Sequence, residues 1–249
     1  MSLTRQQWIA YSKLPLFVLL AAPALWLSYQ AIFAPQLLGA DPAKSLLDQT
    51  GIWAIRMILL ALAVTPLRIL TGQNYLIQYR RMTGLFTFFY ATLHFLVYSV
   101  LLLELDIAQI SIEVTQRPYI VVGFIALLLY IPLAVTSTKG WQRRLKRNWV
   151  KLHKLVYLIG ILAVVHMTWL KKVGLYDTWP YALLLIVLLG IRIVHHYRQK
   201  KLNTTRRTNP IHPRLFDLCG IPGFSNKPPV QKTNKPLSSA KPIQMENPI

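Results

Sequence analysis

The sequence contains only one cysteine, Cys219, among its 249 residues. A disulfide within the chain needs two cysteines, and a cysteine metal site needs several, so both are excluded. The chain also has no glycine-rich dinucleotide fingerprint and no Walker loop, which excludes the common phosphate-cradling sites. We expect no soluble dehydrogenase domain after the last apolar segment, so a redox function here has to receive electrons from a quinol or a separate flavoprotein.

Charged residues are scarce, and acidic ones most of all. Asp and Glu number eight against 28 Lys and Arg, and charged residues make up 14% of the chain. An average soluble domain contains about 25% charged residues. Hydrophobic residues make up 54% of the sequence. This composition predicts an all-α integral membrane protein.

The formal net charge of +20 is a feature of many nucleic-acid-binding proteins, but its distribution argues against that class. The basic residues cluster in a few connections between apolar segments and in the C-terminal part of the chain. Membrane proteins use this pattern to orient themselves in the bilayer. We therefore expect membrane lipid, and no nucleic acid, beside the basic residues.

Six segments are apolar and long enough to cross a bilayer, which needs about 20 residues. In chain order they are Leu14–Phe33, Gly51–Leu70, Met82–Leu103, Tyr119–Ser137, Val150–Leu170 and Trp179–Tyr197. The first is expected to remain uncleaved, because a signal peptide has a shorter apolar core. The prediction is an N-terminal segment (1–13), a six-helix transmembrane bundle (14–197) and a basic, mostly disordered tail (198–249).

Basic and acidic residues alternate between the connections. The connections after the second, fourth and sixth segments carry most of the Lys and Arg, including Arg80, Arg81 and the stretch 139–147. The remaining connections carry most of the Asp and Glu. The positive-inside rule therefore predicts that both termini lie in the cytoplasm.

Two histidines lie deep in predicted spans. At about 1.5 Å per residue, His94 lies about 18 Å from the span edge at Met82, and His166 about 24 Å from Val150. Ionisable residues in a span are costly and indicate function. A neutral imidazole offers one lone pair to iron, so this pair predicts a haem held between two spans, away from the cytoplasm. The alternative is that each histidine only bonds a backbone carbonyl or a threonine hydroxyl.

Other residues are weaker candidates. His153 lies only about 4–5 Å into its span. It can ligate a second haem at the level of Arg80, although arginine itself is a poor iron ligand, or it can bond lipid or a loop. Arg56, inside the second span, and Arg117, just before the fourth, can bind haem propionates or extend to the lipid headgroups.

These residues lie in motifs that occur together in a known family. The motifs are Leu38-Gly39-Ala40-Asp41-Pro42, Thr65-Pro66-Leu67, Tyr79-Arg80-Arg81, Ala91-Thr92-Leu93-His94, Arg117-Pro118-Tyr119 and Leu152-His153, followed by His166. Over about residues 35–195 the chain resembles the MsrQ (YedZ) family. Its members are haem-binding membrane subunits of bacterial periplasmic methionine sulfoxide reductase systems, within the ferric-reductase-like transmembrane group.

The resemblance implies a haem b protein of the bacterial inner membrane. Such a protein passes electrons from quinol or a cytoplasmic flavin reductase to a periplasmic molybdopterin subunit, MsrP, where the substrate chemistry takes place. The resemblance also implies FMN, for which the chain shows no motif. The wider group carries two histidines on its third span, and this chain has Arg80 at the first of these positions. The alternatives are a self-contained ferric or quinone reductase and a non-redox transporter or scaffold.

Overall fold

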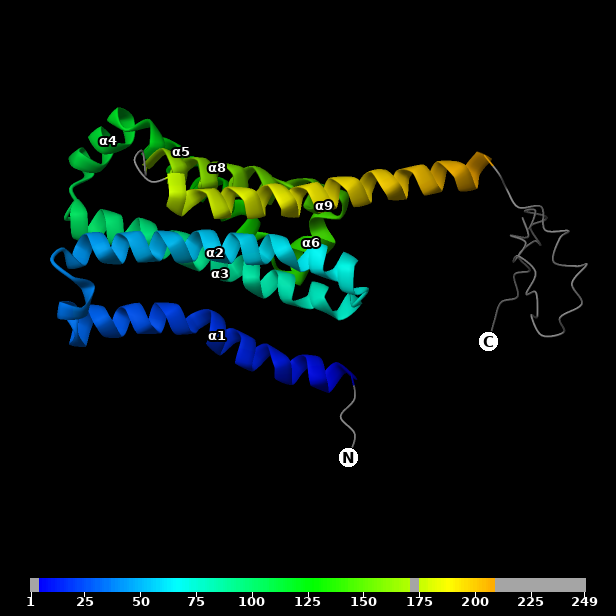
Figure 1. Cartoon of the computed structure of the whole chain (residues 1–249), viewed down its shortest axis with the longest axis horizontal. Helices are drawn as coiled ribbons and strands as arrows, with labels where there is room; N and C mark the ends of the chain where they lie inside the picture. The colour runs from blue at the N-terminus through cyan, green and yellow to red at the C-terminus, as the bar shows by residue number, and fades with distance from the viewer. Residues whose placement is uncertain (1–4, 171–174, 209–249) are drawn as a thin grey trace, which may run out of the picture. The chain divides into compact units, whose positions relative to one another are not determined.

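The computed structural model of the protein describes residues 5–170 and 175–208. These residues form helices and connections, with no strand among them (Figure 1). The long helices are α1 (Arg5–Phe33), α2 (Pro42–Thr71), α3 (Arg80–Val97), α5 (Pro118–Val135), α8 (Leu155–Leu170) and α9 (Leu175–Thr208). The shorter ones are η1 (Pro35–Leu38), η2 (Asn74–Tyr79), the π-helical turn η3 (Tyr98–Leu102), α4 (Ile107–Gln116), α6 (Lys139–Leu145) and α7 (Arg147–Leu152).

Six segments of the described residues are long and apolar enough to cross a membrane, which confirms the predicted number. They are Tyr11–Phe33, Pro42–Thr71, Asn74–Leu102, Pro118–Val135, Arg147–Leu170 and Asp177–Leu202. The second begins earlier than predicted because Asp41 caps it. The Asp41 carboxylate accepts a hydrogen bond from the backbone N–H of Lys44 at 3.0 Å, and proline is favoured at the first helical position.

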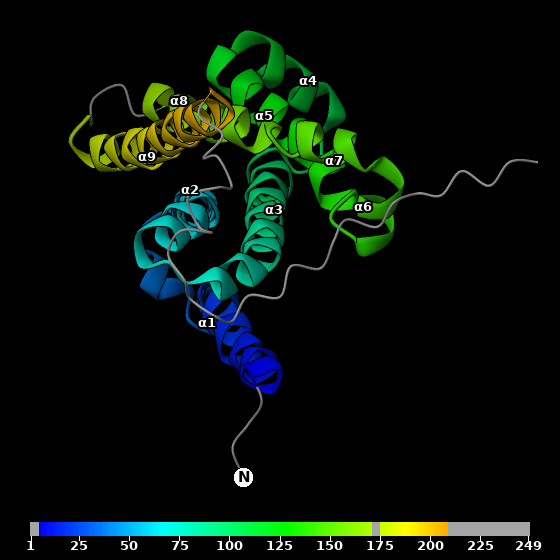
Figure 2. The ribbon, with the colours of Figure 1, turned by 90° about the vertical axis from the view of Figure 1, so that its right-hand side faces the viewer.

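The spans belong to the compact unit that ends at Leu202. Helix α2 packs against α3, and α5 packs against α8 (Figure 1 and Figure 2). The largest apolar core lies between α2, α5, α8 and α9 and includes Leu62, Ile159 and Leu188. A second core, around Tyr90, joins α1 to α2 and α3. Because α2 contributes to both cores, it is the central helix of the bundle.

A proline in α2 leaves one backbone carbonyl without its helical partner, and a distant arginine replaces that partner. Pro66 has no N–H, so the carbonyl of Leu62 cannot accept the usual bond from four residues ahead. Arg192 of α9 donates a hydrogen bond to this carbonyl through Nη2 and another to the Tyr157 hydroxyl through Nη1. A charged side chain in a predicted span is thereby tied to the backbone of the central helix.

Helix α1 contains Pro23 and is bent (Figure 1). Next to the proline, the Tyr90 hydroxyl inserts into the backbone ladder of α1. It accepts from the N–H of Ala24 at 3.0 Å and donates to the carbonyl of Leu20 at 2.8 Å. A side chain inserted between these two groups bends a helix, and the same two bonds attach α3 to α1.

The charges divide the bundle into two ends. We name the end with the α2–α3 connection, α6 and α7 the basic end. The opposite end, with α4 and the first turns of α2 and α9, is the acidic end. It holds every acidic residue that the structure describes: Asp41, Asp48, Glu104, Asp106, Glu113 and Asp177. That the basic end faces the cytoplasm stays a prediction.

Two helical stretches differ from the sequence expectation. Helix α4 forms after Asp106, whose carboxylate accepts from the N–H of Ala108 at 2.9 Å. It has ten residues, too few to cross a bilayer. Helix α9 continues to Thr208, past Tyr197 where the tail was expected to begin, because Arg, Lys, Gln and Leu after Tyr197 are good helix formers. The rest of the predicted tail, 209–249, lies outside the described residues.

Candidate functional site

His94 on α3 and His166 on α8 face each other across a cavity that opens toward the acidic end. Their ring centroids lie 6.4 Å apart, and the ring planes are inclined by 74°. The cavity has a volume of about 620 Å³ and is lined by residues of α2, α3, α5 and α8. The structure thus brings together the two histidines that the sequence paired. Haem ligation by them stays a prediction.

The distance between the two rings fits two ligands on opposite sides of one metal ion. A histidine nitrogen binds a metal at about 2.0–2.1 Å and lies about 1.1 Å from the ring centre, which places the two centroids about 6.3 Å apart. No group of three or more His, Cys, Asp or Glu in the described part of the chain can hold a metal ion. A metal between these imidazoles would therefore need further ligands from a cofactor, which a haem would supply, with His94 and His166 as the residues that would hold it.

Both histidines use their Nδ1 atoms to bond the backbone of a neighbouring segment. Nδ1 of His94 lies 3.0 Å from the Leu47 carbonyl oxygen, and Nδ1 of His166 lies 2.5 Å from the Tyr119 carbonyl oxygen. Since a carbonyl oxygen can only accept, Nδ1 carries the proton and the lone pair of the neutral ring is at Nε2. Metal-binding histidines need this arrangement, because the second bond sets the orientation of the ring.

The alternative is that the two histidines only form hydrogen bonds with polar groups of the protein. Among the residues that the structure describes, each imidazole forms such bonds through Nδ1 alone. Within residues 5–170 and 175–208, Nε2 of His94 and Nε2 of His166 have no hydrogen-bond partner. Both rings line the cavity and leave Nε2 without a bond, which a ligand at Nε2 explains and polar packing alone does not.

A glycine on a neighbouring helix lies against each imidazole. A Cβ atom on Gly123 of α5 would lie 2.8 Å from Cε1 and Nδ1 of His166, and one on Gly51 of α2 would lie 3.0 Å from Cε1 of His94. The missing side chains therefore make room for the two rings. Sequence reasoning missed both glycines. The available signal was a glycine inside an apolar helix, which is about 1 kcal/mol less favourable there than alanine.

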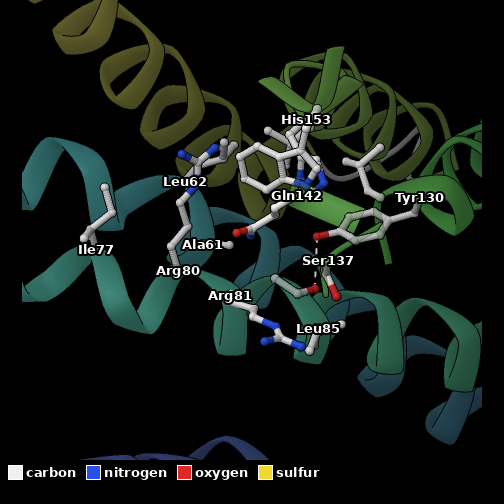
Figure 3. A pocket seen from close by; sticks show the side chains of 14 residues that line it. Ala61, Leu62, Ile77, Arg80, Arg81, Leu85, Tyr130, Ser137, Gln142 and His153 are labelled. Atoms are coloured by element: carbon white, nitrogen blue, oxygen red, sulfur yellow. Dashed lines mark hydrogen bonds between the residues drawn. The ribbon is translucent and has the colours of Figure 1, made fainter. Parts of the chain in front are cut away.

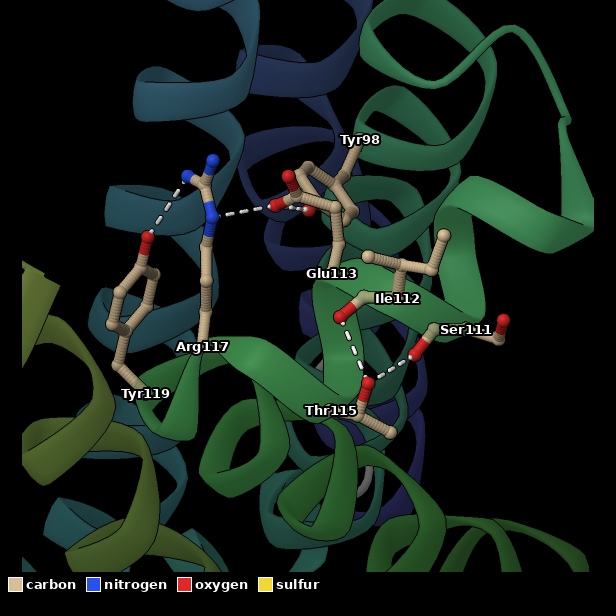
Figure 4. Close-up of polar contacts among 7 residues, drawn as sticks. All are labelled: Tyr98, Ser111, Ile112, Glu113, Thr115, Arg117 and Tyr119. Atoms are coloured by element: carbon tan, nitrogen blue, oxygen red, sulfur yellow. Dashed lines mark hydrogen bonds and ion pairs between the residues drawn. The ribbon is translucent and has the colours of Figure 1, made fainter.

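A polar network joins Tyr98, Arg117 and Tyr119 (Figure 4), three residues that line this cavity. Arg117 forms an ion pair with Glu113 at 2.8 Å and donates a hydrogen bond to the Tyr119 hydroxyl at 3.1 Å. Tyr98 donates to Glu113 at 3.2 Å. The hydrogen bond to Tyr119 raises the pKa of Arg117 above its ordinary value. Because Arg117 also lines the cavity, the network holds a permanent cation at its mouth.

Arg56, the other arginine predicted to bind a propionate, is not among the residues that line the cavity. Its guanidinium lies 4.8 Å from the centre of the Trp53 ring, and its Nε donates to the Tyr181 hydroxyl at 3.4 Å. Lys44 and Arg117 are the cations in the lining that the structure describes. The structure therefore places these two residues, and not Arg56, beside the cavity.

A second cavity, of about 320 Å³, lies near the basic end (Figure 3). Arg80 and His153 both line it. The His153 ring packs 4.1 Å from the Trp149 ring, and its Nε2 lies 3.2 Å from the Thr136 hydroxyl. Tyr130 lines both cavities and forms part of the wall between them. The structure thus separates His153 from the His94–His166 pair and places it with Arg80, as the sequence estimate of depth suggested.

Comparison with known proteins gives one matching family and a set of similar proteins. A family described as "Ferric reductase like transmembrane component" matches residues 50–164. The heme-binding subunit MsrQ of protein-methionine-sulfoxide reductase from Xanthomonas axonopodis pv. citri (strain 306) is 51% identical over 173 residues, which cover 70% of this chain and 79% of that protein. The subunit of the same name from Polaromonas naphthalenivorans (strain CJ2) is 39% identical over 202 residues, covering 79% and 91%. No solved structure matches the chain significantly.

Proposed function

The chain belongs to the MsrQ heme-binding subunits within the ferric-reductase-like transmembrane family, and we propose that it is the haem-binding electron-transfer subunit of a methionine sulfoxide reductase system. The relatives are named for haem binding and for this reductase. The observation in this chain that carries the proposal is the 6.4 Å separation of the His94 and His166 rings, with Nδ1 of each bound to a carbonyl oxygen.

His94 and His166 would hold a haem b through Nε2 in the cavity that opens toward the acidic end. The haem supplies a one-electron carrier whose iron alternates between two oxidation states. The protein sets ring orientation through the carbonyls of Leu47 and Tyr119. Arg117 and Lys44 line the cavity, together with the carboxylates of Asp41 and Asp48, and these two cations can donate hydrogen bonds to anionic propionates. The apolar part of the lining, such as Ile55, Ile58 and Phe124, would lower the polarity around a bound metal and so contribute to its reduction potential.

The orientation of the chain in the proposal follows from the charges. Under the positive-inside rule the basic end lies in the cytoplasm and the acidic end in the periplasm of the bacterial inner membrane. The chain would pass electrons from a quinol or a cytoplasmic flavin reductase to a periplasmic molybdopterin partner, MsrP. The chemistry on methionine sulfoxide would take place on that partner. FMN remains a prediction from the resemblance, and a second haem near His153 remains an alternative.

The test is a pyridine haemochrome assay with a haem-to-protein ratio on the purified full-length chain, together with reduced-minus-oxidised spectra. His94→Ala and His166→Ala should each lower the haem content by about tenfold or more, as loss of a metal ligand does. His196→Ala, at an exposed position on α9, is the matched control and should keep the wild-type content. Unchanged haem in both ligand variants would refute the assignment. Oxidation of the reduced chain by ferric chelates as fast as by MsrP would favour the self-contained reductase.

A further inference from the structure

The two candidate haem ligands are held by the same local arrangement, which occurs once on α2 and once on α5. The carbonyl oxygen that accepts from Nδ1 lies 47 residues before the histidine in both cases, on Leu47 for His94 and on Tyr119 for His166. In both helices a glycine follows that carbonyl by four residues, and an added Cβ there would meet the imidazole. Because the Cα–Cβ bond of a helical residue is tilted toward the helix N-terminus, each glycine leaves the carbonyl one turn earlier open to the ring.

The two arrangements differ at the residue just before the glycine, which is Thr50 on α2 and Val122 on α5. The hydroxyl oxygen of Thr50 lies 3.3 Å from Nδ1 of His94. A valine side chain has no polar atom, so Val122 offers His166 no such contact. Of the two imidazoles, that of His94 alone has a hydroxyl group beside Nδ1 in the part of the chain that the structure describes.

The tautomer of His94 determines the direction of the bond with Thr50. Nδ1 of His94 lies 3.0 Å from the Leu47 carbonyl oxygen, which can only accept, so Nδ1 carries the proton. The Thr50 oxygen therefore accepts from Nδ1. Its own proton is donated to the backbone, where the carbonyl oxygens of Leu46 and Leu47 lie 2.8 and 2.9 Å away. The bonds form a chain from the imidazole through the hydroxyl to the backbone of α2.

Burial strengthens this chain of bonds. Thr50 is 1% exposed, and hydrogen bonds in series polarise one another in surroundings of low dielectric constant. A hydroxyl that donates to a carbonyl is thus a better acceptor for Nδ1. The second bond of a metal-binding histidine sets the orientation of the ring and raises the basicity of the nitrogen that binds the metal. His94 has two acceptors for this purpose, the Leu47 carbonyl and the Thr50 hydroxyl.

A threonine inside a helix can also bond only the carbonyls one turn earlier, with no further role. Thr83 on α3 is such a residue. It is buried, and its hydroxyl lies 3.2 Å from the Tyr79 carbonyl oxygen and 3.1 Å from that of Arg80. Thr83 therefore shares the backbone bonds of Thr50 and has no described bond to an imidazole, which makes it the matched control.

We propose that Thr50 is a positioning residue for His94, whose hydroxyl restricts rotation of the imidazole and raises the electron density at Nε2. A more basic Nε2 stabilises the oxidised, more highly charged state of a bound metal. The Thr50 hydroxyl therefore lowers the reduction potential of the site, since hydrogen bonding to an axial ligand is one means by which a protein sets that potential. The inference rests on the proposed function, because it concerns a haem held by His94 and His166.

The test compares Thr50→Val with Thr83→Val in the purified full-length chain in detergent. Valine removes the hydroxyl and keeps the shape of the side chain. Thr50→Val should raise the midpoint potential in a redox titration followed by haem absorbance. It should also change the electron paramagnetic resonance spectrum of the oxidised haem, which responds to the orientation of the axial ligands. Transfer of haem to apomyoglobin should be about 2- to 10-fold faster, as expected for loss of one hydrogen bond. Thr83→Val should leave all three at wild-type values.

Thr50→Ser separates the hydroxyl from the packing of the side chain. Serine keeps the hydroxyl and lacks the methyl group, so the potential and the resonance spectrum should return close to those of the wild type. If Thr50→Val does not fold, Thr50→Ala takes its place, with Thr83→Ala as its control.

Equal potentials, resonance spectra and transfer rates in Thr50→Val and Thr83→Val would overturn the proposal, as would a Thr50→Ser variant that behaves like Thr50→Val. Either result leaves the proposed function standing if the wild-type chain holds haem and His94→Ala loses it. A wild-type chain without haem, or a His94→Ala variant that keeps it, would refute the proposed function and the role of Thr50 together.

Discussion

The two cavities of the bundle both contain histidine, but they arrange it differently. The cavity toward the acidic end has two imidazoles from different helices, each anchored through Nδ1 and each packed on a glycine. The basic-end cavity is lined by one described histidine, His153, whose Nε2 lies 3.2 Å from the Thr136 hydroxyl. Two imidazoles whose Nε2 atoms are both unbonded suit a metal. A single described imidazole whose Nε2 is engaged by Thr136 suits one less well.

The largest effect on haem content is expected from replacing a histidine, and it should differ between the two cavities. His166→Ala should remove most of the bound haem, because an axial ligand and its anchored orientation are both lost. His153→Ala should leave the haem content close to wild type, since its ring lies in the other cavity. Haem-to-protein ratios of the two variants, measured side by side, make the comparison. A fall from two haems to one in His153→Ala would instead show a haem in each cavity.

The next effect concerns the glycine at His166. Gly123→Ala introduces a Cβ 2.8 Å from the imidazole, and overpacking of this kind costs about 1–3 kcal/mol. We expect weaker haem retention and a shifted reduced-minus-oxidised spectrum, because the ring has to move. Gly190→Ala on α9 is the control, since nothing lies within 4 Å of its added Cβ. Identical haem retention in the two variants would show that the ring tolerates displacement.

Replacing Arg192 should have a smaller effect, on the stability of the bundle, and it tests the bond between Arg192 and the Leu62 carbonyl. Arg192→Ala leaves the Leu62 carbonyl without a donor, and a buried unsatisfied carbonyl costs about 1–3 kcal/mol. Pro66→Ala restores the N–H that helix α2 lacks at this point. The double variant should therefore lose less stability than Arg192→Ala alone. Thermal unfolding of the four proteins in detergent measures this, and strictly additive losses would contradict the pairing.

The smallest effect is expected at the mouth of the acidic-end cavity. Arg117→Gln removes the ion pair with Glu113, in which the Arg117 side chain is 52% exposed. Exposed pairs contribute about 0.2–1 kcal/mol and weaken with salt. Stability should fall by no more than that, and the difference from wild type should shrink in high salt. A large loss that salt does not change would mean that Arg117 acts by packing.

Sequence reasoning predicted most of the fold because the membrane simplifies the problem. Long apolar runs predict spanning helices directly, and the predicted number of spans is confirmed. Helix α4 was missed because ten residues of mixed polarity carry no spanning signal. Helix α9 continues past Tyr197, the predicted end of the last span, because lysine and arginine mark a membrane boundary but continue a helix well.

At the candidate site, the rise per residue was enough to pair His94 with His166 and to set His153 apart. It could not identify the carbonyls of Leu47 and Tyr119 or the glycines Gly51 and Gly123, because these lie on other helices. The position of Arg56 could likewise be predicted only in part. Its depth in the second span was visible in the sequence, but its direction around the helix, toward Trp53 and Tyr181, depends on packing.

The sequence by itself determined that this chain is a six-span helical membrane protein with two histidines deep in its spans, because hydrophobicity and helical rise are properties of each segment alone. Only the tertiary structure decided that the two rings stand 6.4 Å apart with Nε2 unbonded, and that Arg192 bonds the carbonyl freed by Pro66. Those contacts join residues far apart in the chain, so they depend on which helix faces are packed together.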